Sequence, residues 1–411
     1  MIIKNVKVYT PERTFEEGEI VIRDGVIGEV RTNRRLSDCE QQEVESMERE
    51  APGKALDGRE MTECEVIDGQ GCYAIPGLID LHFHGCVGHD FCDGTKEAIG
   101  AIAKYEASVG VTAICPATMT LPVEELEHIL AVAAEYKRET EADPQKDSSG
   151  ADLIGINMEG PFISPAKKGA QDARNIIPCD TGICQRFLDA SEGLVKFVGI
   201  APEESDASTS FIEQMKDRVH ISLAHTNADY DTAKAAYDAG ASHAVHLYNA
   251  MPPFTHRAPG VVGAVEDSGH VTAELICDGV HIHPSVVRAT FGMMGADRMI
   301  LISDSMRATG MPDGRYLLGG LEVDVVGNRA TLVSDGALAG SATNLADCMR
   351  VAVKQMGLPL ETAVACATAN PARKLGVYDQ YGSIEAGKKA DVVLLDRELG
   401  LKLVVKDGKR L

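Results

Sequence analysis

Short apolar stretches alternate with segments of helical periodicity through the middle of the chain. Apolar side chains recur at helical spacing over 95–109, 123–141 and 231–239, and Gly110 follows the first of these segments as a C-cap. Buried strands that alternate with helices are typical of βαβ units and a parallel sheet. The pattern therefore predicts a (β/α)8 TIM-like barrel over residues 75–380. Its eight expected strands lie within 78–84, 111–117, 153–159, 195–201, 220–225, 243–247, 271–277 and 299–304.

Both ends of the chain carry a different pattern, in which short β-rich runs are joined by tight turns such as Asp24-Gly25 and Asp407-Gly408. We expect residues 1–74 and 381–411 to form one small β-sandwich domain, so the fold class is α/β with a barrel and a terminal sheet domain. Residues 32–64 are highly charged and poor in large apolar side chains. We interpret them as an exposed excursion without chemistry of its own.

Charge and composition exclude several classes of partner. The net charge is −22 and the sequence pI is about 5.0, so we expect neither nucleic acid nor an anionic membrane surface as a partner. No apolar run approaches the roughly 20 residues that span a bilayer, and the N-terminus does not resemble a secretion signal. The eleven cysteines form no CxxC pair, which favours reduced thiols and a cytoplasmic location.

Polar residues end the apolar runs far more often than packing requires. In a barrel, the carboxyl ends of the strands meet at one rim, where active sites lie. Any one of these residues could serve a structural hydrogen bond, but together they predict metal-dependent chemistry at that rim. The set comprises His82, His84, Glu159, His225, His246, Asp278, His281 and Asp304.

Two groups of metal ligands are expected within this set. Glu159, His225 and His246 would form a His2Glu site with one position left for water, as in catalytic zinc sites. His82 and His84 point the same way from a strand, because side chains alternate between its faces. They would hold a second ion, so we expect one or two divalent ions per chain. Zinc is the first expectation, and iron, manganese, cobalt or nickel also suit these ligands.

Two further residues suggest acid–base and anion chemistry. Asp304 ends the eighth run, where a carboxylate can take a proton from water and return it to a leaving amine. Arg257 follows the sixth run on a loop rich in Pro and Gly, and its guanidinium suits a phosphate. An exposed Arg without a ligand fits the sequence equally well. Asn249 and Ala250 could offer donors to the same anion.

Several motifs together resemble the N-acetylglucosamine-6-phosphate deacetylase family of the amidohydrolase superfamily. The resemblance covers nearly the whole chain, and 246–251 followed by Arg-x-Pro-Gly is especially specific. Residues 387–391, Gly-Lys-Lys-Ala-Asp, resemble the superfamily's return into its terminal sheet domain. The motifs are Met-Glu-Gly-Pro-Phe (158–162), Ala-His-Thr-Asn-Ala (224–228), His-Leu-Tyr-Asn-Ala-Met (246–251), Asp-Gly-Val-His (278–281) and Ser-Asp (303–304).

The resemblance implies hydrolysis of N-acetyl-D-glucosamine 6-phosphate to acetate and D-glucosamine 6-phosphate, with Asp304 as the catalytic acid–base. It also implies a homodimer in which the phosphate site is partly shared between subunits. Gln171 stands where some members carry a His that polarises the acetyl carbonyl, and we expect the ion at His82 and His84 to compensate. The implied substrate contacts are Ala170, Gln171, Asn249, Ala250, Arg257, Asp278, His281, Leu338, Ala339 and Gly340.

Three alternatives to this function stay open at this point. The first is the same reaction on the galactosamine epimer, since the residues that face the C4 hydroxyl are not identifiable. The second is a cyclic amidase of the same superfamily, which the sequence disfavours because Lys196 opens the fourth run instead of closing it. The third is a non-catalytic sugar-phosphate sensor, which would have no use for a complete ligand set beside Asp304.

Overall fold

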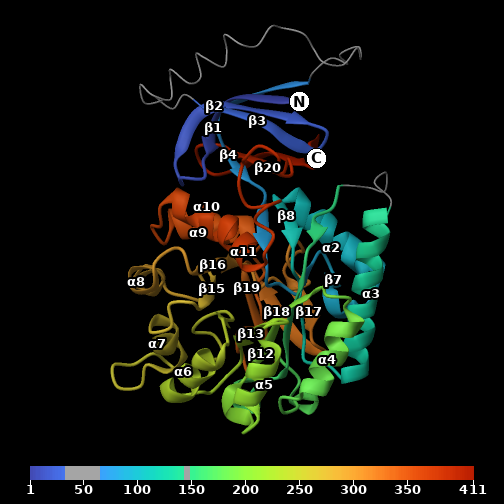
Figure 1. Cartoon of the computed structure of the whole chain (residues 1–411), viewed down its shortest axis with the longest axis vertical. Coiled ribbons are helices and arrows are strands. Elements are labelled where there is room, and N and C mark those ends of the chain that lie inside the picture. The colour runs from blue at the N-terminus through green and yellow to red at the C-terminus, as the bar shows by residue number, and fades with distance from the viewer. Residues whose placement is uncertain (33–64, 143–148) are drawn as a thin grey trace. The chain divides into compact units, whose positions relative to one another are not determined.

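The computed structural model describes residues 1–32, 65–142 and 149–411 (Figure 1). The chain divides into two compact units, one made of Met1–Pro76 with Ser383–Arg410 and the other of Gly77–Gly382. Apart from Thr32, the charged excursion expected at 32–64 lies outside the described residues.

The first unit is one seven-stranded sheet that both ends of the chain build together, as the blue and red strands of Figure 1 show. The strand order is β22-β21-β20-β4-β1-β2-β3, and every neighbouring pair is antiparallel except β1 with β4. Val26 of the edge strand β3 pairs with Lys389, which lies just before β20. The sheet must therefore curve to bring these two positions together. Its strands are β1 (Ile2–Tyr9), β2 (Phe15–Arg23), β3 (Val26–Thr32), β4 (Val66–Pro76), β20 (Val392–Leu395), β21 (Leu401–Lys406) and β22 (Lys409–Arg410).

The second unit contains strands in all eight predicted apolar runs, and their pairing is parallel throughout. The ring closes where the Asp304 amide donates to the His82 carbonyl at 3.0 Å, joining the ends of the eighth and first runs. The α/β barrel predicted from the sequence is thus confirmed. The strands are β5 (Leu78–Asp80), β8 (Val111–Ile114), β9 (Ala117–Thr118), β10 (Asp152–Leu153), β11 (Ile156–Phe162), β12 (Val195–Ile200), β13 (His220–Leu223), β14 (His243–Ala244), β15 (Thr272–Ile276) and β16 (Met299–Ile302).

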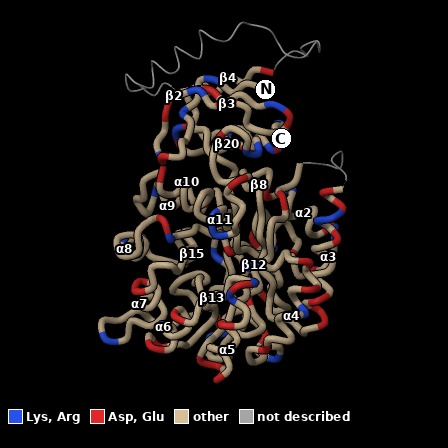
Figure 2. The backbone as a smooth tube through the Cα atoms, viewed as in Figure 1, with Lys and Arg blue, Asp and Glu red and all other residues tan. Residues whose placement is uncertain are grey.

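Helices surround these strands, and three of them match the predicted periodic segments (Figure 1). The Thr95 hydroxyl caps α2 by accepting from the Ala98 amide at 3.2 Å, which satisfies one donor of the first turn. Figure 2 shows acidic residues along the helices, α3 among them, with basic residues between. The helices are α2 (Lys96–Ser108), α3 (Val123–Ala142), α4 (Thr181–Ala190), α5 (Ser208–Met215), α6 (Tyr230–Ala239), α7 (Gly260–Glu266), α8 (Pro284–Met294), α9 (Leu345–Lys354), α10 (Leu360–Ala367) and α11 (Ala369–Lys374).

Short elements complete this unit at and around the strand ends. They are β6 (Gly85–Cys86), β7 (His89–Asp90), and the 3-10 turns η1 (Phe91–Asp93), η2 (Pro165–Lys167), η3 (Ala173–Asn175) and η4 (Pro202–Glu204). Among the described residues, no helix is both long enough and apolar enough to cross a membrane.

A three-stranded antiparallel sheet follows the eighth barrel strand, and the sequence analysis did not predict it. It consists of β17 (Gly314–Leu318), β18 (Leu321–Val326) and β19 (Arg329–Leu332). Its buried face packs Leu318 and Val323 against Met306, close to the end of the eighth strand. Because the sheet packs there, the loop that follows it places residues 337–340 at the barrel rim.

Candidate metal-dependent active site

One carboxylate lies at the centre of the barrel rim, and two imidazoles face one of its oxygens. Glu159 extends from β11, while His225 and His246 follow β13 and β14. Glu159 Oε1 lies 3.0 Å from His225 Nε2 and 2.7 Å from His246 Nε2. The two Nε2 atoms are 3.2 Å apart. All three side chains are buried, so the predicted His2Glu group is assembled in space.

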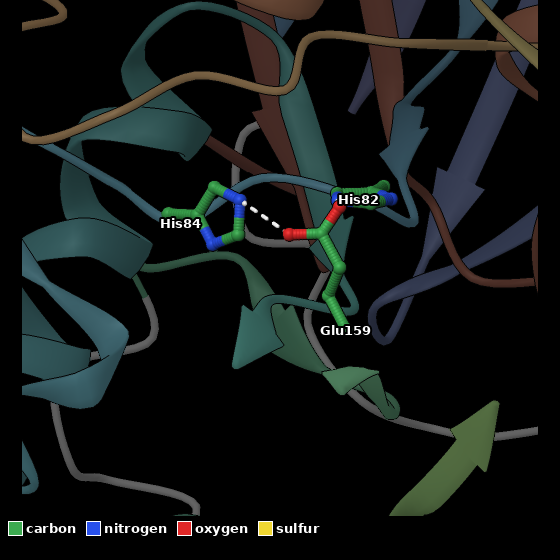
Figure 3. Close-up of side chains that lie close together, drawn as sticks. All are labelled: His82, His84 and Glu159. Carbon is green, nitrogen blue, oxygen red and sulfur yellow. Dashed lines mark ion pairs between the residues drawn. The ribbon is translucent and has the colours of Figure 1, made fainter. Parts of the chain in front are cut away.

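The second predicted group shares the same carboxylate, as Figure 3 shows. His82 Nε2 lies 3.4 Å from Glu159 Oε1, and His84 Nε2 lies 3.3 Å from Glu159 Oε2. The two rings therefore lie on either side of the carboxylate (Figure 3). This arrangement allows Glu159 to contribute an oxygen to each of two neighbouring cation sites.

In His225 and His246, Nε2 faces Glu159 and Nδ1 faces away from it. The partner of Nδ1 fixes the orientation of each ring. His225 Nδ1 lies 2.8 Å from the Lys167 carbonyl, and His246 Nδ1 lies 3.2 Å from the Asn249 carbonyl. A carbonyl only accepts, so each Nδ1 carries a proton and each ring turns its Nε2 towards Glu159. Each Nε2 is thus placed to bind a cation that sits beside the carboxylate. Ring-orienting contacts of this kind are usual around bound metals.

His82 is also oriented through its Nδ1, by a contact in the barrel interior. Its Nδ1 lies 2.9 Å from Glu274 Oε2, while its buried Nε2 has no hydrogen-bond partner among the described residues. A buried polar nitrogen without a partner costs about 1–3 kcal/mol unless a ligand uses it. Both groups therefore offer imidazole nitrogens and a carboxylate oxygen, which are ligand types that fit a divalent metal.

Asp304 reaches the same point from the end of the eighth run. Its Oδ1 lies 3.3 Å from His84 Nε2 and 3.9 Å from His82 Nε2, and only 7% of the residue is exposed. Burial by itself raises the pKa of Asp304, but the hydrogen bond with His84 and the charge of His82 hold that pKa below its ordinary value. Asp304 is therefore ionised at neutral pH and able to accept a proton.

Three of these residues adopt a left-handed backbone that side chains other than Gly rarely take. The φ angles are 44° at His225, 27° at His246 and 49° at Asp304. Such conformations cost on the order of 1–3 kcal/mol each and occur preferentially at functional sites. Each lies two residues beyond the end of its strand, so β13, β14 and β16 end before the predicted apolar runs do.

A cavity of about 410 Å³ opens beside these side chains. Its volume suits a small molecule of sugar size. Several of the expected substrate contacts line it, namely Ala170, Gln171, Asn249, Ala250, His281, Leu338 and Gly340. Their roles as substrate contacts stay predictions, because geometry alone does not assign a ligand.

Three of the expected contacts do not line this cavity. Arg257 is exposed, with Nη1 2.7 Å from Nε2 of the neighbouring His256. Ala339 is buried beside the cavity wall. Asp278 lies beneath His281, and its Oδ2 is 2.8 Å from His281 Nδ1. Asp278 therefore orients the imidazole that faces the cavity instead of facing the cavity itself.

Gln171 lines the cavity, but its polar atoms are already engaged. Its Oε1 accepts from the Thr120 amide at 2.6 Å, which fixes the orientation of the side-chain amide because a backbone N–H can only donate. Its Nε2 then donates to Glu159 Oε2 at 2.7 Å and lies 3.8 Å from Met119 Sδ. Gln171 thus holds the shared carboxylate in place.

Other residues of the site escaped sequence reasoning. Lys167 lines the cavity, and its carbonyl orients His225. Its position next to Lys168-Gly169 was the sequence feature that could have identified it. Leu318 and Ala337 come from the unpredicted sheet and the loop after it. Glu274 is a charged residue inside an apolar run, and that anomaly could have identified it.

Comparisons with known proteins show the family of this chain. The model of the amidohydrolase family matches residues 73–411. The N-acetylglucosamine-6-phosphate deacetylase of Bacillus subtilis (strain 168) is 35% identical over 410 residues, which cover 99% of this chain and 96% of that protein. The N-acetylgalactosamine-6-phosphate deacetylase of Escherichia coli O157:H7 is 34% identical, over 81% of this chain and 86% of that protein.

A solved structure resembles the whole chain. It is a variant of N-acetyl-D-glucosamine-6-phosphate deacetylase from Mycobacterium smegmatis in complex with N-acetyl-D-glucosamine-6-phosphate. The TM-score is 0.84 and the sequence identity is 31%, with 100% of this chain and 98% of that chain covered.

Proposed function

The chain belongs to the amidohydrolase family and is a hydrolase, and we propose that it hydrolyses N-acetyl-D-glucosamine 6-phosphate to acetate and D-glucosamine 6-phosphate. The observation that carries this proposal is the single carboxylate of Glu159 faced by four imidazoles, with Asp304 3.3 Å from one of them, at the wall of a sugar-sized cavity.

The chain's own residues account for the proton transfers of this reaction. Glu159, His225 and His246 would hold a divalent ion, which would supply polarisation of the acetyl carbonyl and would lower the pKa of a water molecule towards about 7. Asp304 is ionised and directed at the same point, so it accepts the proton of the attacking water. It then returns that proton to the departing amine, and such general acid–base help contributes about 10²–10⁴ in rate.

The cavity residues would orient the sugar. The His281 ring, held by Asp278, faces the cavity and suits a sugar hydroxyl. Asn249 and Ala250 line the same cavity and follow the sixth strand. Arg257 lies outside the cavity of its own chain, so we propose a homodimer in which Arg257 of the partner subunit holds the substrate phosphate.

The metal and the compartment are parts of the same proposal. The His2Glu arrangement favours zinc as the resident ion. The nine described cysteines are all free thiols, which supports a reducing compartment such as the cytoplasm.

The galactosamine epimer is the second candidate substrate. The relative from Escherichia coli O157:H7, which is 34% identical, is a deacetylase of N-acetylgalactosamine 6-phosphate, so sequence identity alone does not separate the two sugars. A cyclic amidase that bridges its metals with a modified lysine is less well supported. Lys196 lies in β12, and its Nζ donates to the Gly193 carbonyl at 2.8 Å, at the start of the strand and away from the rim.

A turnover assay on the two epimeric sugar phosphates tests the proposal. We expect stoichiometric acetate release from N-acetyl-D-glucosamine 6-phosphate by protein purified without added metal, and loss of that release after chelation. Higher kcat/KM on the galactosamine epimer would assign the second candidate. Protein that carries metal but releases no acetate from either sugar would contradict both assignments.

A further inference from the structure

Glu274 places a carboxylate in the interior of the barrel, beneath the metal groups. It lies in β15 and is fully buried, with an exposed fraction of 0%. Four donors surround it. Oε2 accepts from His82 Nδ1 at 2.9 Å and from the His246 amide at 2.8 Å, while Oε1 faces His243 Nε2 at 2.9 Å and Asn157 Nδ2 at 3.4 Å. Both oxygens are thus fully used.

The surroundings of this carboxylate are its unusual feature. Burying a carboxylate is costly unless hydrogen-bond donors or cations replace the water around it. Two of the four donors to Glu274 are imidazoles, and none is a Lys or Arg. One of these imidazoles, His82, also belongs to the second group of candidate metal ligands.

The contacts of Glu274 distinguish the two metal groups. Its only contact with a ligand side chain in either group is the one to His82 Nδ1, because its contact with His246 is to the backbone amide. The ring nitrogens of His225 and His246 are instead oriented by carbonyls, which carry no charge. A carboxylate hydrogen-bonded to a ligating imidazole raises the basicity of that ligand, and its removal typically costs 10–100-fold in metal affinity.

We infer that Glu274 is a positioning residue for the second ion: its carboxylate accepts from His82 Nδ1, fixes the ring with Nε2 facing Glu159 and makes that ring a stronger ligand, so that the His82/His84 group can bind a divalent cation beside the first one. This inference rests on the metal-dependent site proposed above.

The test is the Glu274→Gln variant, which keeps an oxygen for His82 and the His246 amide but removes the charge. Metal-free wild type and variant are titrated with Zn²⁺ against a chromophoric chelator, and each fit gives two dissociation constants. The His84→Asn variant identifies which constant belongs to the second group. We expect Glu274→Gln to bind the first ion as the wild type does and to bind the second about 10–100-fold more weakly.

Glu106→Gln is the matched control. Glu106 is also a fully buried glutamate of the same unit, on α2, but it lies beside Cys86 and contacts no ligand. We expect its two Zn²⁺ constants to equal those of the wild type. If Glu274→Gln does not accumulate as folded protein, Glu274→Asp tests the same contact, because its carboxylate is one methylene further from His82 and should also weaken only the second ion.

Several results would overturn the inference. These are unchanged second-ion affinity in the Glu274 variants, an equal loss at both sites, an equal loss in Glu106→Gln, or a wild type that binds one Zn²⁺ ion only. Acetate release is measured separately on the same preparations. A chain with the expected Zn²⁺ constants but no deacetylation would refute the proposed function and leave the role of Glu274 intact.

Discussion

Replacement of Gln171 by Met removes two buried hydrogen bonds while preserving the length of the side chain. The Nε2 atom of Gln171 donates to Glu159 Oε2 at 2.7 Å, and its Oε1 accepts from the Thr120 amide at 2.6 Å. Only 2% of Gln171 is exposed, so water cannot replace either contact. The variant therefore leaves the Thr120 amide without its acceptor and frees the shared carboxylate.

The expected magnitude follows from these two contacts. A hydrogen bond to a charged group contributes about 1.5–3 kcal/mol, and a buried N–H left without a partner costs about 1–3 kcal/mol. We therefore expect the free energy of unfolding of the metal-free protein to fall by about 2.5–6 kcal/mol, a large part of the 5–15 kcal/mol typical of a domain. The affinity for the metal ions should fall by about 10–100-fold, because Glu159 loses a contact that orients it.

The assay compares urea midpoints of metal-free proteins and Zn²⁺ constants of the same preparations. Gln185→Met is the control, because Gln185 Nε2 also donates to a carboxylate, that of Asp189 at 2.6 Å, but on the surface of α4. Surface contacts of this kind contribute about 0–1 kcal/mol. If Gln171→Met loses no more stability than Gln185→Met and keeps its metal affinity, the assigned role of Gln171 is wrong.

Three further predictions concern other parts of the molecule. Asp304→Asn should lower kcat by about 10²–10⁴ with bound metal retained, because the amide cannot accept the proton of water; full activity in a preparation of verified sequence would contradict this role. Arg257→Ala should raise KM for N-acetyl-D-glucosamine 6-phosphate far more than for the unphosphorylated sugar, and equal effects on both would remove Arg257 from the phosphate site. Burial lowers the pKa of Lys374 to about 7, so between pH 7 and 10.5 its folded form is neutral while its unfolded form is charged. Stability should therefore rise with pH in this window, by about 1–3 kcal/mol between pH 7 and 9 relative to Lys374→Met, and parallel pH profiles of the two proteins would show that Lys374 keeps its charge.

The sequence by itself predicted the architecture and the candidate metal ligands. Apolar runs that alternate with helices allow few solutions other than a barrel, and a parallel barrel gathers the ends of all its strands at one rim. For this reason Glu159, His225 and His246 could be expected to meet even though they lie far apart along the chain. Asp304 could be added to them by the same rule, because it ends the eighth run.

The tertiary structure alone decided how those side chains are held. His82 and Glu274 are 192 residues apart, and no local pattern links them. The direction of the Gln171 amide depends on Thr120 and Glu159, and the left-handed backbone at His225, His246 and Asp304 depends on closure of the ring. Local periodicity reveals which side chains are buried. Which buried polar atoms meet is decided only when strands from distant parts of the chain close the barrel around them.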